Sequence, residues 1–125
     1  MKILVVANQK GGVGKTAMSL HLAWHMETVG LRVLVIDLDT QGNASYSLRD
    51  KTCIFGSGRL FGNMKDADLH MPSNVSLVLA PATNDLANVQ NMTLQNAVQF
   101  FTQNIGKLKA GGQFDVCIID TPPSL

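Results

Sequence analysis

The sequence contains few cysteines and has no excess of charge of one sign. Its only two cysteines, Cys53 and Cys117, do not belong to a C-x-x-C pair. We therefore expect two free thiols, as in cytoplasmic proteins. The chain has 10 lysines and arginines against 9 aspartates and glutamates, which gives a formal net charge of +1. This balance predicts no broad electrostatic attraction of residues 1–125 to DNA or anionic lipid.

Long apolar runs are also absent. The longest run, ILVVA, is far shorter than the ~20 residues that a membrane-spanning helix needs. The first ten residues, MKILVVANQK, hold too short an apolar stretch for a signal peptide. The chain has 125 residues, of which 46% are hydrophobic. That composition predicts one globular domain.

Four short apolar segments predict buried strands. They cover residues 2–7, 32–37, 75–81 and 114–120, and none of them alternates between apolar and polar residues. Continuous apolar runs of this kind are typical of parallel strands that are buried on both faces. The first two flank a helix, and such a strand-helix-strand unit favours a parallel crossover.

Helical periodicity occurs twice between these strands. We expect a helix over 16–29, with an apolar stripe formed by Met18, Leu22, Met26 and Val29. A second helix is expected where apolar residues recur at Leu94, Ala97, Val98, Phe101, Ile105 and Leu108. TQGNASYSL predicts a loop that enters a short helix, and the rest of 40–73 is predicted to be irregular, with one short helix near 60–65. The fold class is α/β, a doubly wound and mostly parallel sheet with helices on both faces.

Residues 8–16, NQKGGVGKT, almost reproduce the phosphate-loop pattern G-x-x-x-x-G-K-[ST]. Gly14, Lys15 and Thr16 match its end, whereas Gln9 stands where its first glycine is expected. A glycine-rich loop between a strand and a helix offers backbone N–H groups and a helix N-terminus to phosphate oxygens. Lys15 would then contact the β- and γ-phosphates, and the Thr16 hydroxyl would ligate Mg²⁺. The alternative is a glycine-rich turn with an incidental lysine, which the strand-loop-helix context disfavours.

Aspartates end two of the predicted strands. Asp37 and Asp39 stand at the tip of the second strand, and Asp120 ends the fourth. The carboxyl ends of parallel strands meet at one edge of the sheet, where α/β proteins bind ligands. Beside a Mg²⁺–nucleotide, such carboxylates hold metal-bound water or position an attacking water. Each pattern alone also fits an ordinary strand-end turn. His21 and His25 are four residues apart on a helix, but without a third ligand we expect a solvated face.

Together these stretches resemble the deviant Walker A ATPases of the ParA/MinD type, a class of P-loop NTPases. KGGVGKT, residues 10–16, matches the family signature K-G-G-x-G-K-[ST] at every position. DLDTQGNAS resembles the D-x-D-P-Q-G-N-A of the ParA branch, and IIDTPPSL resembles its Walker B strand and the start of its switch II. Ala17 replaces a usual second threonine, and Thr40 replaces a usual proline. Neither departure removes a charged group.

The resemblance implies a role for each matching residue. The catalytic residues would be Lys10, Lys15 and Asp39, with Lys10 reaching the phosphates bound by a partner protomer and Asp39 orienting the attacking water. ATP would be held by Lys10, Gly11, Gly12, Val13, Gly14, Lys15, Thr16 and Ala17. Mg²⁺ would be held by Thr16, Asp37, Asp39 and Asp120, with Asp120 as the Walker B acid.

The resemblance also implies a biological role. ParA-type ATPases dimerise on binding ATP, coat DNA non-specifically, and are reset when a centromere-binding partner protein stimulates hydrolysis. This cycle segregates plasmids or chromosomes. The expected partners are therefore a second copy of the chain, DNA and the centromere-binding protein, with no membrane, in a cytoplasmic and nucleoid-associated location. A MinD-like positioning ATPase and a nucleotide-gated interaction module without useful hydrolysis are the alternatives; DTQGNA favours ParA.

The chain stops just past the Walker B strand, whereas members of this family are longer. We therefore expect residues 1–125 to be the N-terminal part of a single P-loop ATPase domain, truncated after that strand. The C-terminal half would supply the adenine contacts and most DNA-binding residues. Its absence would also leave the first strand with an unpaired apolar edge.

Overall fold

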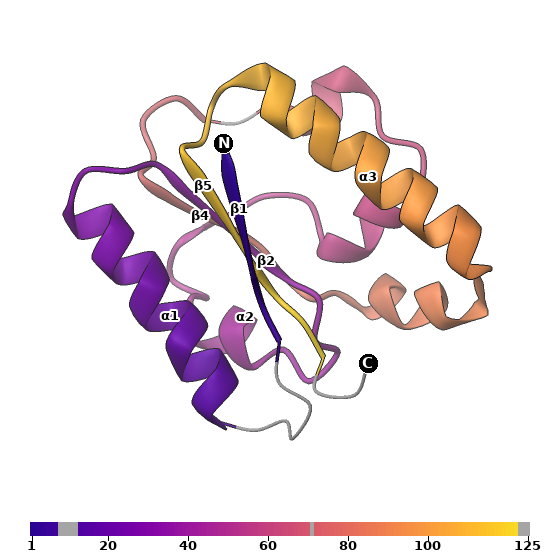
Figure 1. Cartoon of the computed structure of the whole chain (residues 1–125), viewed down its shortest axis with the longest axis horizontal. Coiled ribbons are helices and arrows are strands. Elements are labelled where there is room, and N and C mark those ends of the chain that lie inside the picture. The colour runs from indigo at the N-terminus through magenta and orange to yellow at the C-terminus, as the bar shows by residue number, and fades with distance from the viewer. Residues whose placement is uncertain (8–12, 71, 123–125) are drawn as a thin grey trace.

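The computed structural model describes residues 1–7, 13–70 and 72–122. Five strands, all paired in parallel, form one sheet in the order β1-β5-β2-β4-β3 (Figure 1). The strands are β1 (Lys2–Val6), β2 (Val33–Asp37), β3 (Thr52–Cys53), β4 (Leu77–Ala80) and β5 (Val116–Asp120). The helices are α1 (Val13–Thr28), α2 (Asn43–Ser47) and α3 (Leu94–Gly111), and the short 3-10 helices are η1 (Ser57–Phe61), η2 (Asp66–Leu69) and η3 (Asn84–Asn91).

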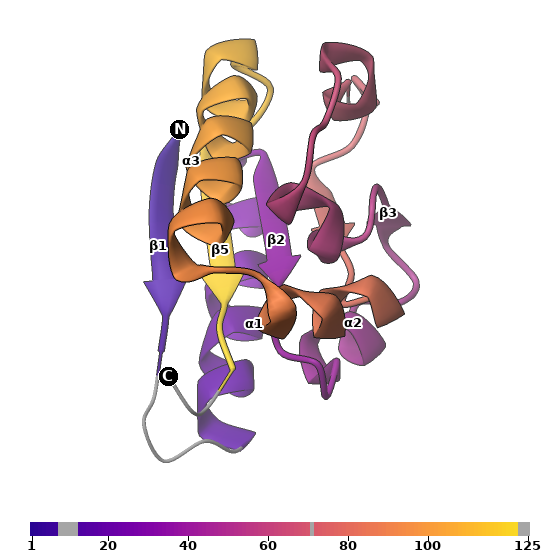
Figure 2. The ribbon, with the colours of Figure 1, turned by 90° about the vertical axis from the view of Figure 1, so that its right-hand side faces the viewer.

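The helices cover both faces of the sheet. Figure 1 shows the sheet edge-on, so that its strands overlap one behind another. Helix α1 lies on one side of the sheet and α3 on the other. Because β5 lies between β1 and β2, the β1-α1-β2 unit crosses over one strand. The predicted doubly wound parallel sheet is thus confirmed. The strands run in one direction, and α1 begins at the end where β1 and β5 finish (Figure 2).

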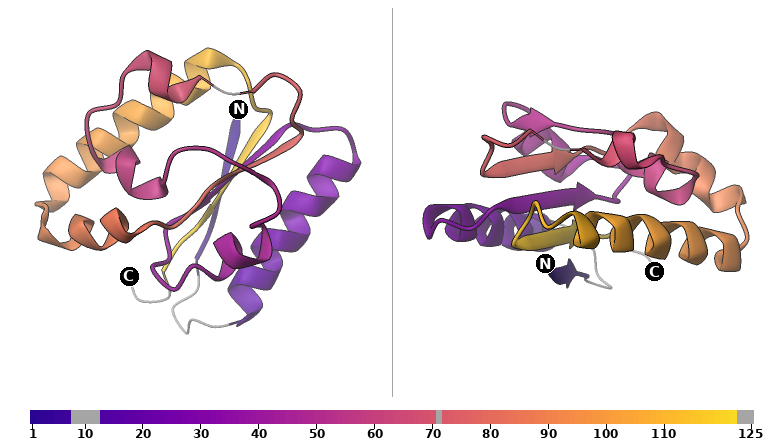
Figure 3. Two further views of the ribbon diagram at one scale, coloured as in Figure 1. Left: turned by 180° about the vertical axis from the view of Figure 1, so that it is seen from behind. Right: turned by 90° about the horizontal axis from the view of Figure 1, so that it is seen from above.

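Successive residues of each central strand enter two separate cores. Leu34 and Ile36 of β2 pack with Ile105 and Leu108 of α3. Their neighbours Val33 and Val35 pack on the opposite face with Leu20 and Ala23 of α1. This alternation follows from the pleat of a strand. Both cores are apolar, which explains why the strands read as continuous apolar runs. The view from above shows the helices on either side of the sheet (Figure 3).

The buried face of α1 differs from the predicted apolar stripe. Met18 and Val29 are each 59% exposed, so the prediction that they face the core is wrong. Leu22 and Met26 of the predicted stripe do pack against the core, where they are partly buried. The fully buried face carries Lys15, Ser19 and Ala23, spaced by four residues. Buried polar residues thus occupy the sheet-facing side of the first turns of α1. A prediction from the periodicity of apolar residues alone therefore indicated a face of α1 next to the one that is buried.

The second predicted helix is confirmed as α3, but its apolar stripe is only partly buried. Ile105 and Leu108 lie in the core, and Phe101 stacks on Phe61 with a distance of 5.1 Å between ring centroids. Leu94 and Val98 are 81% and 54% exposed. The first half of α3 thus presents apolar side chains that the described residues leave uncovered.

The short helix predicted near 60–65 lies earlier in the chain, as η1 (Ser57–Phe61), so the predicted bounds are wrong. η1 ends at Phe61 and η2 begins at Asp66, so the chain between them is not helical. The buried side chain of Asn104 on α3 explains the end of η1, because its Nδ2 donates to the carbonyls of Leu60 (2.8 Å) and Gly62 (2.9 Å). These carbonyls are therefore satisfied by α3 rather than by further helical turns. The short strand β3 and the helix η3 were also not predicted.

A glycine allows η1 and η3 to approach closely. A Cβ added at Gly58 would lie 2.6 Å from Asp85 Oδ1 and 2.8 Å from the backbone nitrogen of Leu86. No side chain fits at that separation, so the glycine is needed for packing.

At the other side of the sheet, β1 pairs with β5 and forms the edge of the described sheet, and its Val5 is 60% exposed. This confirms the expected apolar edge.

Candidate functional site

The site is built on the carboxyl ends of three adjacent strands. Asp37 of β2 and Asp120 of β5 are register partners. The backbone nitrogen of Leu38 donates to the Asp120 carbonyl at 2.8 Å, which holds the ends of β2 and β5 together. The Thr121 hydroxyl donates to the Val6 carbonyl at 2.8 Å and joins the end of β1 to them. The three strand exits are therefore fixed relative to one another.

Lys15 places a buried ammonium group between two carboxylates. Its Nζ lies 2.8 Å from Asp120 Oδ1 and 3.9 Å from Asp39 Oδ2. The side chains of Lys15 and Asp120 are each 1% exposed, and that of Asp39 is 7% exposed. Lys15 lies in the first turn of α1, where the N-terminal N–H groups and the helix dipole also favour a negative ligand. The arrangement suits a polyphosphate, which could replace the carboxylates as the partner of Lys15.

Two hydroxyl groups of α1 point at the same aspartate. Ser19 Oγ donates to Asp120 Oδ1 at 3.0 Å, and Thr16 Oγ1 donates to Asp120 Oδ2 at 3.4 Å. Ser19 lies four residues after Lys15, so both fall on the face of α1 that meets β5. The longer contact of Thr16 indicates a hydroxyl that can turn towards another partner at little cost. Asp120 thus accepts from an ammonium group and two hydroxyls.

Asp37 is completely buried and is engaged by hydrogen bonds from its own loop. Its Oδ1 accepts from the backbone nitrogen of Asp39 at 3.0 Å. Its Oδ2 accepts from the backbone nitrogen of Ser45 at 2.8 Å and from Ser45 Oγ at 2.6 Å. Burial raises the pKa of Asp37, the Ser45 hydrogen bonds oppose that shift, and the nearby Asp120 charge adds to it. In this structure Asp37 organises the loop that carries Asp39.

Asp39 has one carboxylate oxygen in the loop and one facing the cluster. Its Oδ1 accepts from the backbone nitrogen of Gln41 at 3.0 Å, which stabilises the turn after β2. Its Oδ2 is the oxygen that faces Lys15. This geometry leaves Asp39 Oδ2 directed towards the place where a phosphate bound by Lys15 would lie.

The described part of the site has three buried carboxylates and one ammonium group, which form a charged cluster. Its members are Asp37, Asp39, Asp120 and Lys15. Buried negative charges in excess favour a cation. No three His, Cys, Asp or Glu side chains in residues 1–7, 13–70 and 72–122 are arranged to hold a metal ion by themselves. Mg²⁺ does not need such a cage, because it keeps several waters and binds one or two carboxylates together with substrate phosphates. The donor set of the Thr16 hydroxyl, Asp39 and Asp120 fits Mg²⁺ bound in that way.

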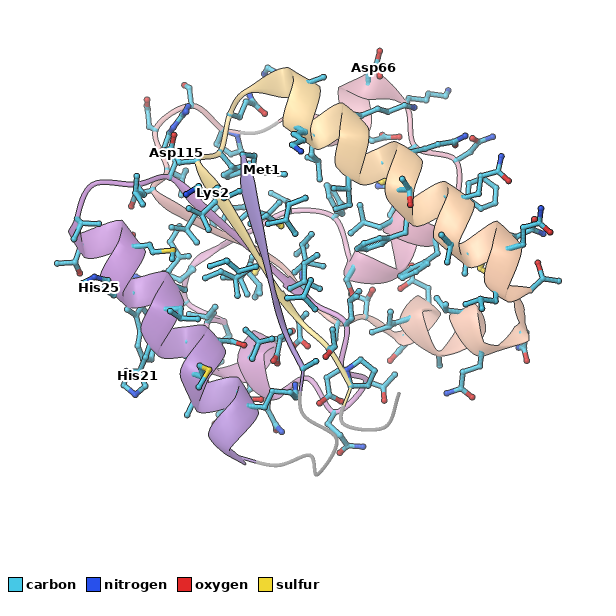
Figure 4. All side chains as sticks on the ribbon, in the orientation of Figure 1. Met1, Lys2, His21, His25, Asp66 and Asp115 are labelled. Carbon is cyan, nitrogen blue, oxygen red and sulfur yellow. The ribbon has the colours of Figure 1, made fainter. Side chains whose placement is uncertain are left out.

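Other predicted residues fall into three groups. Lys10, Gly11 and Gly12 lie outside the described residues. Val13 begins α1, Gly14 is exposed and Ala17 is half-buried, so the end of the predicted loop does pass into the helix. The histidines His21 and His25 lie on the outer side of α1, away from the sheet (Figure 4), as expected for a solvated face.

A pocket of about 780 Å³ adjoins the cluster. Asp39 and Thr121 are among the residues that line it, together with apolar residues of η3 and α3. Leu94 and Val98, the exposed positions of the α3 stripe, are among them. The part of the α3 stripe that lies outside the core therefore lines this pocket.

Sequence reasoning missed Ser19, Ser45 and Thr121. For Ser19 a signal existed, since its spacing from Lys15 puts both on one face of a helix. Ser45 is the last residue of the DLDTQGNAS stretch, but nothing in the sequence shows that its hydroxyl returns to Asp37. Thr121 directly follows Asp120, and its bond to Val6 depends on the order of strands in the sheet.

The whole chain, residues 1–125, matches a family model described as AAA domain. The chain belongs to this AAA-domain family. Some of the curated relatives that it resembles are named as chromosome-partitioning proteins, which confirms the resemblance to the ParA/MinD type. None of the described helices of this AAA-domain chain is long and apolar enough to cross a membrane.

The chain is 44% identical over 139 residues to Protein IncC of Escherichia coli, covering all of this chain and 36% of IncC. It is 33% identical over 133 residues to the chromosome partitioning protein ParA of Caulobacter vibrioides, covering all of this chain and 49% of that protein. Among solved structures, the cobyrinic acid a,c-diamide synthase of Mycobacterium smegmatis with a bound ATP analogue and magnesium is 35% identical, with a TM-score of 0.77 over 99% of this chain and 51% of the synthase. The AAA-domain chain therefore spans about a third to a half of the length of these proteins.

Proposed function

We propose that the complete protein is a Mg²⁺-dependent ATPase of the ParA partition type, and that residues 1–125 form the N-terminal part of its single ATPase domain. The buried contact of Lys15 with Asp120 and Asp39 carries the proposal, because it places a cation, a helix N-terminus and two carboxylates at one point. The names of the chromosome-partitioning relatives support the biological role.

Lys15 binds the β- and γ-phosphates in this proposal. The phosphates replace Asp120 as the partner of the ammonium group, so that the lysine remains paired in both states. Lys10 belongs to the same signature and would contact the phosphates bound by a second protomer. Gly11, Gly12, Val13 and Gly14 would supply backbone N–H groups, with Thr16 and Ala17 completing the loop.

Thr16 and the aspartates would hold Mg²⁺, which neutralises the phosphate charge when bound. The Thr16 hydroxyl would be the direct ligand, and Asp120 would hold metal-bound water. Asp37 supports this site through the loop of Asp39, since both of its oxygens already accept hydrogen bonds in the structure. The structure of the synthase with an ATP analogue and magnesium supports ATP and Mg²⁺ as the bound species.

Asp39 orients the attacking water. Its Oδ2 faces Lys15 and can accept a hydrogen bond from a water placed beside the γ-phosphate. The water oxygen forms a bond to the γ-phosphorus, and the bond from that phosphorus to the bridging oxygen breaks. The products are ADP, which keeps the bridging oxygen, and inorganic phosphate, which retains the water oxygen; one proton of the attacking water is released to the solvent.

The biological cycle would use an ATP-dependent homodimer. It would bind non-specific DNA through the C-terminal half and respond to a centromere-binding partner, in the cytoplasm on the nucleoid. The near-neutral charge of residues 1–125 agrees with DNA-binding residues elsewhere in the protein.

ATP turnover by the complete protein tests the function. We expect phosphate release that requires Mg²⁺ and falls by about a hundredfold in Asp120→Asn. Exposed Asp50 provides the control, Asp50→Asn. ATP binding without turnover would instead support the interaction module, and binding to anionic vesicles rather than DNA would support the MinD-like alternative.

A further inference from the structure

Ser45 forms hydrogen bonds with two other segments of the chain, the end of β2 and the segment that follows β4. It lies in α2, and its Oγ donates to Asp37 Oδ2 at 2.6 Å while its backbone nitrogen donates to the same oxygen at 2.8 Å. The hydroxyl oxygen in turn accepts from the backbone nitrogen of Ala82 at 2.9 Å. One side chain therefore joins the end of β2 to the segment that leaves β4.

These bonds continue to the loop of Asp39. The second oxygen of Asp37, Oδ1, accepts from the backbone nitrogen of Asp39. The carboxylate of Asp37 accepts from both sides at once, and Ser45 supplies two of the three hydrogen bonds that hold it. Asp37 is 0% exposed, so water cannot easily replace a lost partner. The orientation of Asp37, and with it the position of the Asp39 backbone, depends on Ser45.

We propose that Ser45 is a positioning residue for ATP hydrolysis, which fixes the carboxylate of Asp37 and thereby places Asp39. This inference rests on the proposed ATPase function and deepens it. Ser45 acts through Asp37 and not on the nucleotide. Lys15 and Thr16, which would bind the phosphates, belong to α1 and make none of the Ser45 bonds.

The proposal predicts a separation of turnover from binding. In the complete protein, Ser45→Ala should lower kcat about tenfold, because one strong hydrogen bond to a carboxylate is lost. The KM for ATP and the affinity for a fluorescent ATP analogue should stay within about twofold of the unmodified protein. Ser45→Thr retains a hydroxyl and should restore kcat. Ser47→Ala, an exposed serine of the same helix, should leave kcat unchanged.

A folding defect is separated from a positioning defect by Ser45→Cys. The thiol is close in size to the hydroxyl but is a weak donor, so this variant should fold and still show the reduced kcat. An unchanged kcat in Ser45→Ala and Ser45→Cys overturns the proposal, as does a loss of ATP affinity equal to the loss of kcat. If the unmodified protein turns over ATP and the variants match it, only the role of Ser45 is refuted. If the unmodified protein has no turnover, the proposed function itself is refuted, and the role of Ser45 with it.

Discussion

Lys15 and Asp120 form a buried ion pair of 2.8 Å that joins the first turn of α1 to the end of β5. The two residues are separated by 105 positions in the sequence, and each side chain is 1% exposed. Ser19 reinforces the pair by donating to the same oxygen of Asp120. A phosphate that binds Lys15 must therefore compete with an internal carboxylate, which couples nucleotide binding to the contacts between α1 and β5.

Removal of the lysine charge should destabilise the nucleotide-free protein. Lys15→Met keeps most of the side-chain volume but leaves Asp120 without its cation, which costs about 3 kcal/mol in the free energy of unfolding. Urea unfolding of the complete protein measures this loss. Lys109→Met, at an exposed lysine of α3, should change stability by less than about 0.5 kcal/mol.

The double variant Lys15→Met/Asp120→Asn distinguishes the pair from two independent effects. The double variant should lose clearly less free energy of unfolding than the sum of the losses in the two single variants. The reason is that the second change removes the charge that the first leaves unpaired. Strict additivity would show that the ion pair does not couple α1 to β5.

Asp39→Ala should trap the ATP-bound state. Loss of the group that orients the attacking water should slow single-turnover phosphate release by about a hundredfold or more. ATP binding should persist, since Lys15 and Thr16 are unchanged, and light scattering should show an accumulated dimer. Rapid hydrolysis by this variant would remove Asp39 from the catalytic role, whereas Asp50→Ala should behave as the unmodified protein does.

Two glycine substitutions should have opposite effects on stability. Gly58→Ala forces a Cβ against Asp85 and the Leu86 backbone, and we expect a loss of about 1–3 kcal/mol in the free energy of unfolding. Gly106 lies within α3 with no atom within 4 Å of an added Cβ. Gly106→Ala should therefore stabilise by about 0.5–1 kcal/mol. A stabilising Gly58→Ala would contradict the close contact between η1 and η3.

The two cysteines should differ in reactivity. Cys53 is exposed, whereas burial raises the pKa of Cys117 to about 12 from 9.0. Iodoacetamide at pH 8 should label Cys53 in the folded protein and Cys117 only after unfolding, and mass spectrometry of the peptides detects both. The folded protein retains the Cys117 proton more strongly than the unfolded chain does. The stability that this thiol contributes should therefore be complete below pH 9 and decrease between pH 9 and 12. Fast native labelling of Cys117 would contradict its placement in the core.

The predictable part of the fold and site is the part encoded in contiguous segments. The four longer strands, α1 and α3 follow from apolar runs and helical periodicity, and Asp37, Asp39 and Asp120 follow from their places at strand ends. Their convergence could be predicted because parallel strands share one carboxyl edge. Sequence reasoning therefore placed Lys15 beside these acids without any contact being known.

The remaining features depend on contacts between distant segments. Ser45 and Ser19 are ordinary small polar residues until the fold brings their hydroxyls to Asp37 and Asp120. The end of η1 depends on Asn104, more than 40 positions away. The predicted buried face of α1 is correct only for Leu22 and Met26, because the polar residues Lys15 and Ser19 face the sheet. Periodicity reports apolar residues and cannot detect a buried polar face.

Nucleotide binding and dimerisation of Lys15→Ala and Lys10→Ala, measured side by side in the complete protein, test the central claim most directly. A fluorescent ATP analogue reports binding, and sedimentation velocity with a non-hydrolysable analogue reports the dimer. We predict that Lys15→Ala loses binding, and that Lys10→Ala binds the nucleotide but remains a monomer without turnover. Binding of ATP by Lys15→Ala with the affinity of the unmodified protein would contradict the account.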